Sequence, residues 1–76
     1  MLEEIGVLII NIAGWIETAA DASTHLRIGI WDVAQDTWYA TIHNADDEVM
    51  IGESSYGAAS LVEALTDCWQ EIQDQM

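Results

Sequence analysis

Four carboxylates near the end of the chain have the type and spacing needed for electrostatic binding. They are Glu63, Asp67, Glu71 and Asp74. Residues four apart lie about 6 Å from one another along a helix, so these side chains form a row of negative charge roughly 16 Å long. Surface helices ordinarily offset such a row with Lys or Arg, because like charges at this spacing repel. The row predicts contact with a basic surface, and a merely solvated helix face is the alternative.

The whole chain has the same imbalance. Its 76 residues include 14 Asp and Glu but a single basic side chain, Arg27, apart from two His, and the formal net charge is -13. A charge beyond roughly 2–8 in magnitude costs a small domain stability through self-repulsion. A polyanionic surface repels nucleic acid and anionic membranes and is attracted to basic grooves. We therefore expect a basic protein partner, and neither direct nucleic-acid binding nor membrane binding.

A single helical row is sparser than a nucleic-acid backbone. Duplex DNA carries one charge per roughly 1.7 Å of its axis, so a protein that imitates DNA needs a second row. One candidate set lies in the middle of the chain: Asp46, Asp47, Glu48 and Glu53. The alternative set lies in the first predicted helix: Glu3, Glu4, Glu17 and Asp21.

Other chemistry is weakly represented. His25, His43 and Cys68 lack the paired spacing of zinc ligands, so we expect no metal and no cofactor. No Ser-His-Asp order, phosphate-binding loop or dinucleotide motif is present. One basic residue also leaves little to stabilise negative charge in a transition state. We expect a binding protein and not an enzyme.

Composition predicts a folded domain that contains these charges. Half of the residues are hydrophobic (51%) and four are Trp, which excludes an acidic disordered tail. Apolar residues recur at the spacing of a helix face at Leu2, Ile5, Leu8, Ile9, Ile12, Trp15 and Ile16. This spacing predicts a helix over residues 2–22. The alternative is a buried strand over residues 6–12, because this segment is rich in β-branched residues and Gly6 and Gly14 each weaken a helix by about 1 kcal/mol.

The hydrophobic period then changes to two. Leu26, Ile28 and Ile30 alternate with Arg27, Gly29 and Trp31. Strands are expected at residues 26–31, 38–43 and 49–53, joined by polar turns into an antiparallel meander. A closing helix is expected over residues 58–75, with Leu61, Leu65, Cys68 and Ile72 buried on one face. Ser60 or Ser55 would cap it. The predicted fold is one α+β domain over residues 1–76, in the order helix, three strands, helix (αβββα).

Trp31 differs from the other three tryptophans, which we expect in the core. If Leu26, Ile28 and Ile30 face inward, Trp31 lies on the opposite face of the sheet with Arg27, beside Tyr39 and His43 of the next strand. An exposed aromatic patch of this kind marks an interface, either with a second copy of the chain or with another protein. The alternative is that the first helix covers this face.

The passage from Gly52 to Ala64 resembles part of the double-stranded-RNA-binding domain. Gly52, Ser54 and Ala64 stand where that family has a third-strand Gly, a loop residue and a final-helix Ala, and the family has the same αβββα order. The basic cluster with which that family grips phosphate is absent, and Glu63 and Asp67 occupy that helix instead. The resemblance implies the fold and not RNA binding.

In size and charge the chain also resembles the acidic nucleic-acid mimics encoded by phages and mobile elements, which include anti-CRISPR proteins. This resemblance implies an inhibitor that occupies the basic DNA- or PAM-binding groove of a bacterial defence protein such as a CRISPR effector complex. The alternative is an antitoxin-like module that dimerises and neutralises a basic partner.

Cysteine content and hydropathy indicate the compartment. Cys68 is the single Cys, so no intramolecular disulfide is possible, and the apolar stretch over residues 5–16 is shorter than the roughly 20 residues that cross a bilayer. We expect a reducing cytoplasm, that of a bacterial host cell.

Overall fold

The structure is a computed structural model that describes residues 2–19 and 23–75. Its elements are α1 (Leu2–Ala19), β1 (His25–Asp32), β2 (Thr37–His43), β3 (Val49–Ile51), the short 3-10 helix η1 (Glu53–Ser55) and α2 (Leu61–Gln75). The three strands form one antiparallel sheet in the order β1-β2-β3. The predicted α+β fold, αβββα, is confirmed.

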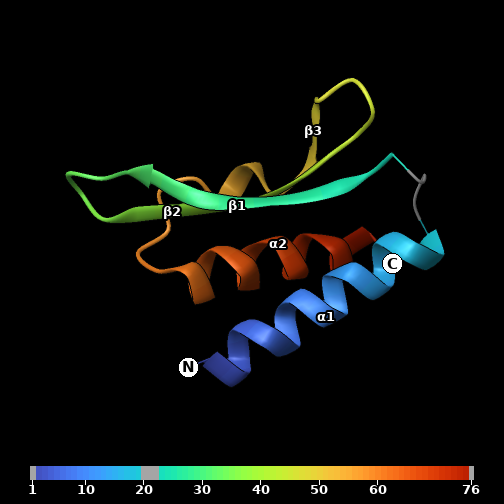
Figure 1. The fold of residues 1–76 in the computed structure, drawn as a ribbon, viewed down its shortest axis with the longest axis horizontal. Coiled ribbons are helices and arrows are strands. Elements are labelled where there is room, and N and C mark those ends of the chain that lie inside the picture. The colour runs from blue at the N-terminus through green and yellow to red at the C-terminus, as the bar shows by residue number, and fades with distance from the viewer. Residues whose placement is uncertain (1, 20–22, 76) are drawn as a thin grey trace.

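Both helices lie on the same side of the sheet, as Figure 1 shows. α2 packs beneath β2, and α1 lies against α2 with only slight contact to β1. The buried core therefore comes mainly from β2, β3 and α2, with one residue from α1: Ile12, Ala40, Ile42, Ile51, Ala64, Leu65, Cys68 and Ile72. Trp15, Trp38 and Trp69 pack against this core, as expected.

Helix α1 includes the segment for which a helix and a strand were both predicted. Residues 6–12 are helical, so the strand alternative for this segment is wrong. Burial follows the predicted face, because Ile5, Leu8, Ile9, Trp15 and Ile16 pack around Ile12. Helix α1 ends at Ala19, and the predicted last turn to residue 22 lies outside the described residues.

Strand β1 is only half covered. Leu26 packs against the core, but Ile28 and Ile30, which share its face, are 41% and 48% exposed. The expectation that all three are buried is therefore wrong for two of them. The physical reason is the position of the helices, because α2 lies under β2 and α1 barely contacts β1.

The second helix begins later than predicted, at Leu61 instead of residue 58. Ala58 pairs with Trp38 as an isolated β-bridge, with hydrogen bonds of 2.8 and 3.2 Å between their backbones, so it extends the sheet. Ser60 caps the helix, since its Oγ accepts the N–H of Glu63 at 3.2 Å. Ser55, the alternative cap, is instead buried and donates to the carbonyl of Ala40 at 2.8 Å.

Candidate functional site

The predicted row of carboxylates lies on α2, on the side away from the buried face. Glu63, Asp67 and Asp74 are exposed, whereas Ala64, Leu65, Cys68 and Ile72 are buried. At 100° per residue, Glu63, Asp67 and Asp74 fall within about 40° of one another around the helix, and Glu71 lies about 40° further. The sequence therefore predicted this row correctly, although its members differ in what they contact.

Glu71 connects α2 to the segment after β3. Its carboxylate accepts the backbone N–H of Gly52 and the hydroxyl of Ser54, the latter at 3.0 Å. The side chain is half-buried. This clamp holds η1 against α2 and places Glu53, which is exposed at the start of η1, beside the row. We call Glu53, Glu63, Asp67, Glu71 and Asp74 the acidic edge.

Glu63 contributes to the start of α2. Its carboxylate accepts the N–H of Ala59 at 3.0 Å while its own N–H donates to Ser60, a reciprocal arrangement close to a capping box. The negative charge at this end also suits the helix dipole. Local stability therefore accounts for Glu63 and Glu71, but not for Asp67, which is exposed and makes no hydrogen bond or ion pair within the described residues.

The turn at residues 46–48 lies elsewhere. It rises on the side of the sheet away from the helices (Figure 1), so it does not adjoin the row on α2. Asn44 shapes the turn, because its side-chain oxygen accepts the N–H groups of Asp46 and Glu48, both at 3.0 Å. Asp46, Asp47 and Glu48 are all exposed.

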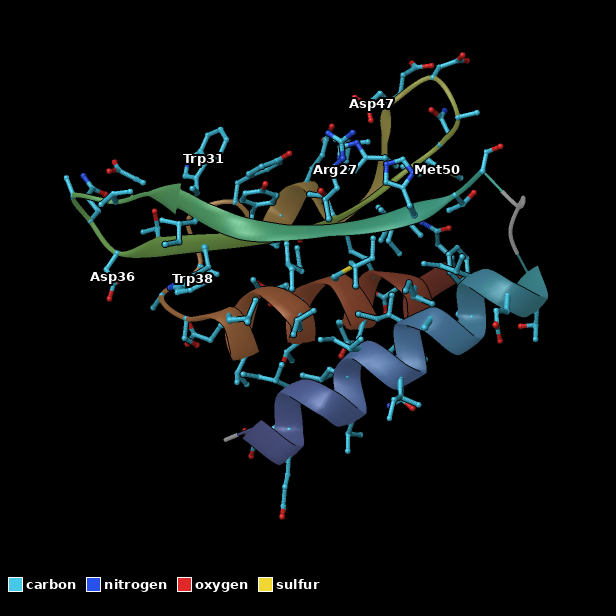
Figure 2. The ribbon with its side chains drawn as sticks, in the orientation of Figure 1. Arg27, Trp31, Asp36, Trp38, Asp47 and Met50 are labelled. Carbon is cyan, nitrogen blue, oxygen red and sulfur yellow. The ribbon has the colours of Figure 1, made fainter. Side chains whose placement is uncertain are left out.

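Asp47 is paired with the single arginine of the chain. Arg27 donates to its carboxylate (Figure 2). Nε2 of His25 lies 3.6 Å from the same oxygen. The hydrogen bond from Arg27, and then the positive charges around it, lower the pKa of Asp47 from its ordinary 3.8, although partial desolvation opposes them. Arg27, the one strong internal counterion, therefore pairs with this turn and not with the acidic edge.

Both histidines belong to the same cluster. The rings of His25 and His43 are stacked, with centroids 5.6 Å apart and planes 14° from parallel. His43 was expected on an exposed face and is in fact buried, with 6% exposed. Its Nδ1 lies 3.2 Å from the carbonyl of Asp47, which can only accept, and its Nε2 lies 2.7 Å from the hydroxyl of Thr41. The Arg and both His of the sequence thus gather around Asp47.

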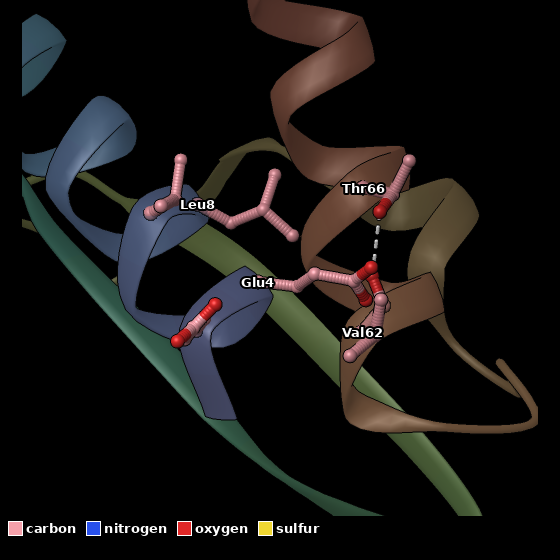
Figure 3. A pocket seen from close by; sticks show the side chains of 6 residues that line it. Glu4, Leu8, Val62 and Thr66 are labelled. Atoms are coloured by element: carbon pink, nitrogen blue, oxygen red, sulfur yellow. Dashed lines mark hydrogen bonds between the residues drawn. The ribbon is translucent and has the colours of Figure 1, made fainter. Parts of the chain in front are cut away.

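The alternative second row lies on α1. Glu3 and Glu4 line a groove of about 540 Å³ between α1 and α2, together with Val7, Leu8, Val62 and Thr66 (Figure 3). The Thr66 hydroxyl is satisfied locally by the Val62 carbonyl at 2.7 Å. Glu17 is exposed near the other end of α1, and Asp21 lies outside the described residues.

The outer face of the sheet, opposite the helices, carries an aromatic cluster. Trp31 is 59% exposed and points away from the helices (Figure 2), so α1 does not cover it. Its indole lies 4.5 Å from the ring of Tyr56 and 6.4 Å from that of Tyr39, measured between centroids. Tyr39 and Tyr56 stack at 5.5 Å. We call these three residues the aromatic platform.

Sequence reasoning missed Tyr56 and the histidine pair. The histidine pair could have been predicted from the sequence, because the position of the turn sets the register of the β1–β2 hairpin. In that register His25 and His43 are partners. Tyr56 follows a 3-10 turn and a left-handed Gly52, and no local pattern indicates where such a segment returns.

Within residues 2–19 and 23–75, no three His, Cys, Asp or Glu side chains are grouped so that they could hold a metal ion. Cys68 is fully buried, and burial, with a smaller effect from Glu71, raises the pKa of its thiol to about 12. In the same part of the chain, neither helix has the length and apolar character needed to cross a membrane.

Comparisons with protein-family models, with curated proteins and with solved structures return no match to this chain.

Proposed function

We propose that the protein inhibits a bacterial nucleic-acid-binding defence protein, as an anti-CRISPR protein does, by presenting the acidic edge to a basic DNA- or PAM-binding groove. One observation carries the proposal: the only Arg is bound to Asp47, so the acidic edge has no Lys or Arg counterion within the chain. A surface with five carboxylates and no such counterion gains most from a partner that supplies Lys and Arg.

Under this proposal the carboxylates have different roles. Asp67 and Asp74 are exposed and lie on the same side of α2, with Glu53 beside them on η1, so these three would make the direct contacts. Glu63 and Glu71 would add charge while they hold α2 and η1 in place. Asp46 and Glu48 would act at most through the long-range field, because their turn lies on the other side of the sheet.

The test is competition for DNA. A labelled PAM-containing duplex is bound to each of a panel of purified CRISPR effector complexes, and the protein is added at salt concentrations from about 50 mM to about 500 mM. We expect displacement of the duplex from at least one complex, with an affinity that falls steeply as salt rises. Displacement from none of them, or an affinity independent of salt, would contradict the mimic.

Charge-matched variants locate the surface. The double variant Asp67→Asn/Asp74→Asn and the control Gln35→Lys/Gln73→Lys, at two exposed positions outside the acidic edge, change the net charge by the same amount, +2. We expect the first to weaken competition clearly more than the second, and Asp67→Lys/Asp74→Lys to weaken it further because reversal adds repulsion. Equal losses in the two charge-matched variants would show that only net charge matters and that the acidic edge is not the contact surface.

The aromatic platform favours a second candidate, an antitoxin-like interaction module that dimerises through the outer face of the sheet. Exposed aromatic residues are enriched at protein interfaces. Sedimentation at increasing protein concentration distinguishes the two candidates. A dimer that Trp31→Ser dissociates would support the module, and a monomer at all concentrations would eliminate it.

A further inference from the structure

The aromatic platform is built into the sheet at the expense of strand stability. The ring of Tyr39 lies over Gly29 of β1, and a Cβ at Gly29 would meet the Tyr39 hydroxyl at 2.9 Å and its ring carbons at 3.0 and 3.1 Å. Gly in the middle of a strand costs roughly 0.5–1 kcal/mol relative to Ala. Only Gly at this position lets the Tyr39 ring lie in its observed place beside Tyr56 and Trp31.

The three rings pack against one another on the outer face of the sheet, and the Trp31 ring is the most exposed of them. The planes of Trp31 and Tyr39 are nearly perpendicular, at 81°, whereas Tyr39 and Tyr56 are within 28° of parallel. The faces of aromatic rings carry partial negative charge and attract cations, so an exposed ring face such as that of Trp31 can bind a cation from solvent. A planar guanidinium can stack on one ring while its edge contacts another.

The protein has no Lys or Arg of its own at this position. It contains no Lys, and Arg27 is held by Asp47. Arg27 also lies four residues from Trp31 along β1, about 13 Å at the rise of a strand. A cation on the platform must therefore come from another molecule.

Charge identifies the kind of molecule. A net charge of -13 attracts cationic groups and opposes both nucleic acid and a second copy of the chain. Acidic residues flank the platform in the sequence, since Asp32 directly follows Trp31, Asp36 is exposed in the hairpin turn and Glu53 opens the 3-10 turn that leads to Tyr56. We propose that the aromatic platform binds an arginine side chain of a partner protein by stacking and cation–π attraction.

The rings of this binding site, those of Trp31, Tyr39 and Tyr56, do not belong to the acidic edge, and Glu53 is the one carboxylate that lies close to both in the sequence. The α2 carboxylates of that edge lie on the helix side of the sheet, and Trp31 points away from that side. Failure of one surface therefore leaves the other untouched. If both hold, the partner offers an arginine to the platform in addition to a basic groove.

The experiment compares two peptides on the unmodified chain. One is acetyl-Gly-Arg-Gly-amide, and in the other citrulline replaces Arg, which keeps the shape of the side chain and removes its charge. The signal is the indole N–H resonance of Trp31, identified by its absence in Trp31→Phe. We expect the Arg peptide to shift this resonance and the Tyr39 and Tyr56 ring signals, with binding two- to fivefold tighter than that of the citrulline peptide, as suits an exposed cation–π contact.

Variants distinguish binding by the aromatic platform from general attraction to the negative charge of the protein. Trp31→Leu keeps an apolar side chain but removes the ring, and it should abolish the difference between the two peptides in the Tyr ring signals. Two control variants should keep the difference between the two peptides. One is Val33→Ala, which shortens an 82% exposed apolar residue on the same hairpin, and the other is Asp67→Asn/Asp74→Asn. Equal binding of the two peptides would overturn the proposal, and that comparison stands even if Trp31→Leu fails to fold. Trp31 shifts that depend on protein concentration without peptide would overturn it too, because they would show a second copy on this face.

Discussion

The turn around Asp47 and the acidic edge of α2 both carry exposed carboxylates, but their charges are satisfied in different ways. Arg27, His25 and His43 all gather around Asp47, whereas no cationic side chain pairs with the acidic edge among the described residues. In the edge, hydrogen bonds to backbone and hydroxyl groups hold Glu63 and Glu71, and Asp67 has no such partner. The excess charge is thus unevenly distributed.

The comparison shows that a count of carboxylates does not locate a binding surface. The turn at residues 46–48 is the densest acidic run of the sequence, but it contains Asp47, which Arg27 already neutralises. The less dense row on α2 is left without cations. Net charge predicts the kind of partner, and the position of the few cations indicates where the partner would bind.

The largest expected effect concerns the junction between the two regions, Gly52. Its φ of +100° is unfavourable for other residues, and a Cβ there would lie 2.3 Å from the carbonyl oxygen of Ala40 and 2.9 Å from Cα of Thr41. Gly52→Ala should lower the free energy of unfolding by about 2–4 kcal/mol, measured by chemical denaturation.

Gly57 provides the matched control. Its φ is +88°, but nothing lies within 4 Å of the position of its Cβ, so Gly57→Ala has only the dihedral cost of about 1–2 kcal/mol. Equal losses for the two variants would show that η1 does not pack closely on β2.

The next prediction compares the contributions to stability of Glu71 and Asp67, two carboxylates one helical turn apart. Glu71→Ala should cost about 1.5–3 kcal/mol, because it removes the acceptor for the Gly52 N–H and the Ser54 hydroxyl. Asp67→Ala should leave stability within about 0.5 kcal/mol of the unmodified protein. Thermal melts of both variants check the contrast, and similar losses would mean that Glu71 is a solvated residue like Asp67.

A smaller effect is expected from Asp47→Asn, and it should depend on pH. Since the pKa of Asp47 is below 3.8 in the folded protein, its ion pair stabilises the fold above that pH, and the stabilisation is lost as the pH falls through the lowered value. The unmodified protein should therefore be more stable than the variant at neutral pH, and the difference should vanish in strong acid. Asp46→Asn is the control. A stability difference of the same size for Asp46→Asn would show that the ion pair with Arg27 is not the cause.

The smallest effect is a gain. Asp67→Lys places a cation four residues from both Glu63 and Glu71, which should stabilise the protein by a few tenths of a kcal/mol per pair. The same variant should bind a basic partner less tightly, so stability and binding would change in opposite directions. Thermal melts beside the DNA competition test this, and a loss of stability would show that the repulsion along the row is negligible.

Local features of this fold were predictable and long-range ones were not. The period of apolar residues gave the two helices and three strands, because helix and strand faces follow from neighbouring residues. It could not show that Ile28 and Ile30 stay half exposed, since this depends on where α1 lies relative to β1. The glycines of α1 suggested a strand, but the packing of six apolar residues on one helix face, of which Ile12 is fully buried, outweighs their low helix propensity.

The candidate site shows the same limit. Spacing alone placed Glu63, Asp67, Glu71 and Asp74 on one face of a helix. The contact of Glu71 with Gly52, across 19 residues, and the approach of Tyr56 to Trp31 result from the chain reversal after β3. No local pattern encodes either contact, so the structural role of Glu71 and the third ring of the platform became visible only in three dimensions.

Strand β1 has one further consequence for the behaviour of the protein in solution. It is eight residues long and forms an edge of the sheet, so its outer N–H and C=O groups are free to pair with another strand, and Ile28, Ile30 and Trp31 lie exposed along it. Mutual repulsion between chains of charge -13 keeps such edges apart at neutral pH. As acid protonates the carboxylates, this protection disappears while the edge remains, and the protein should then assemble edge to edge into β-rich aggregates.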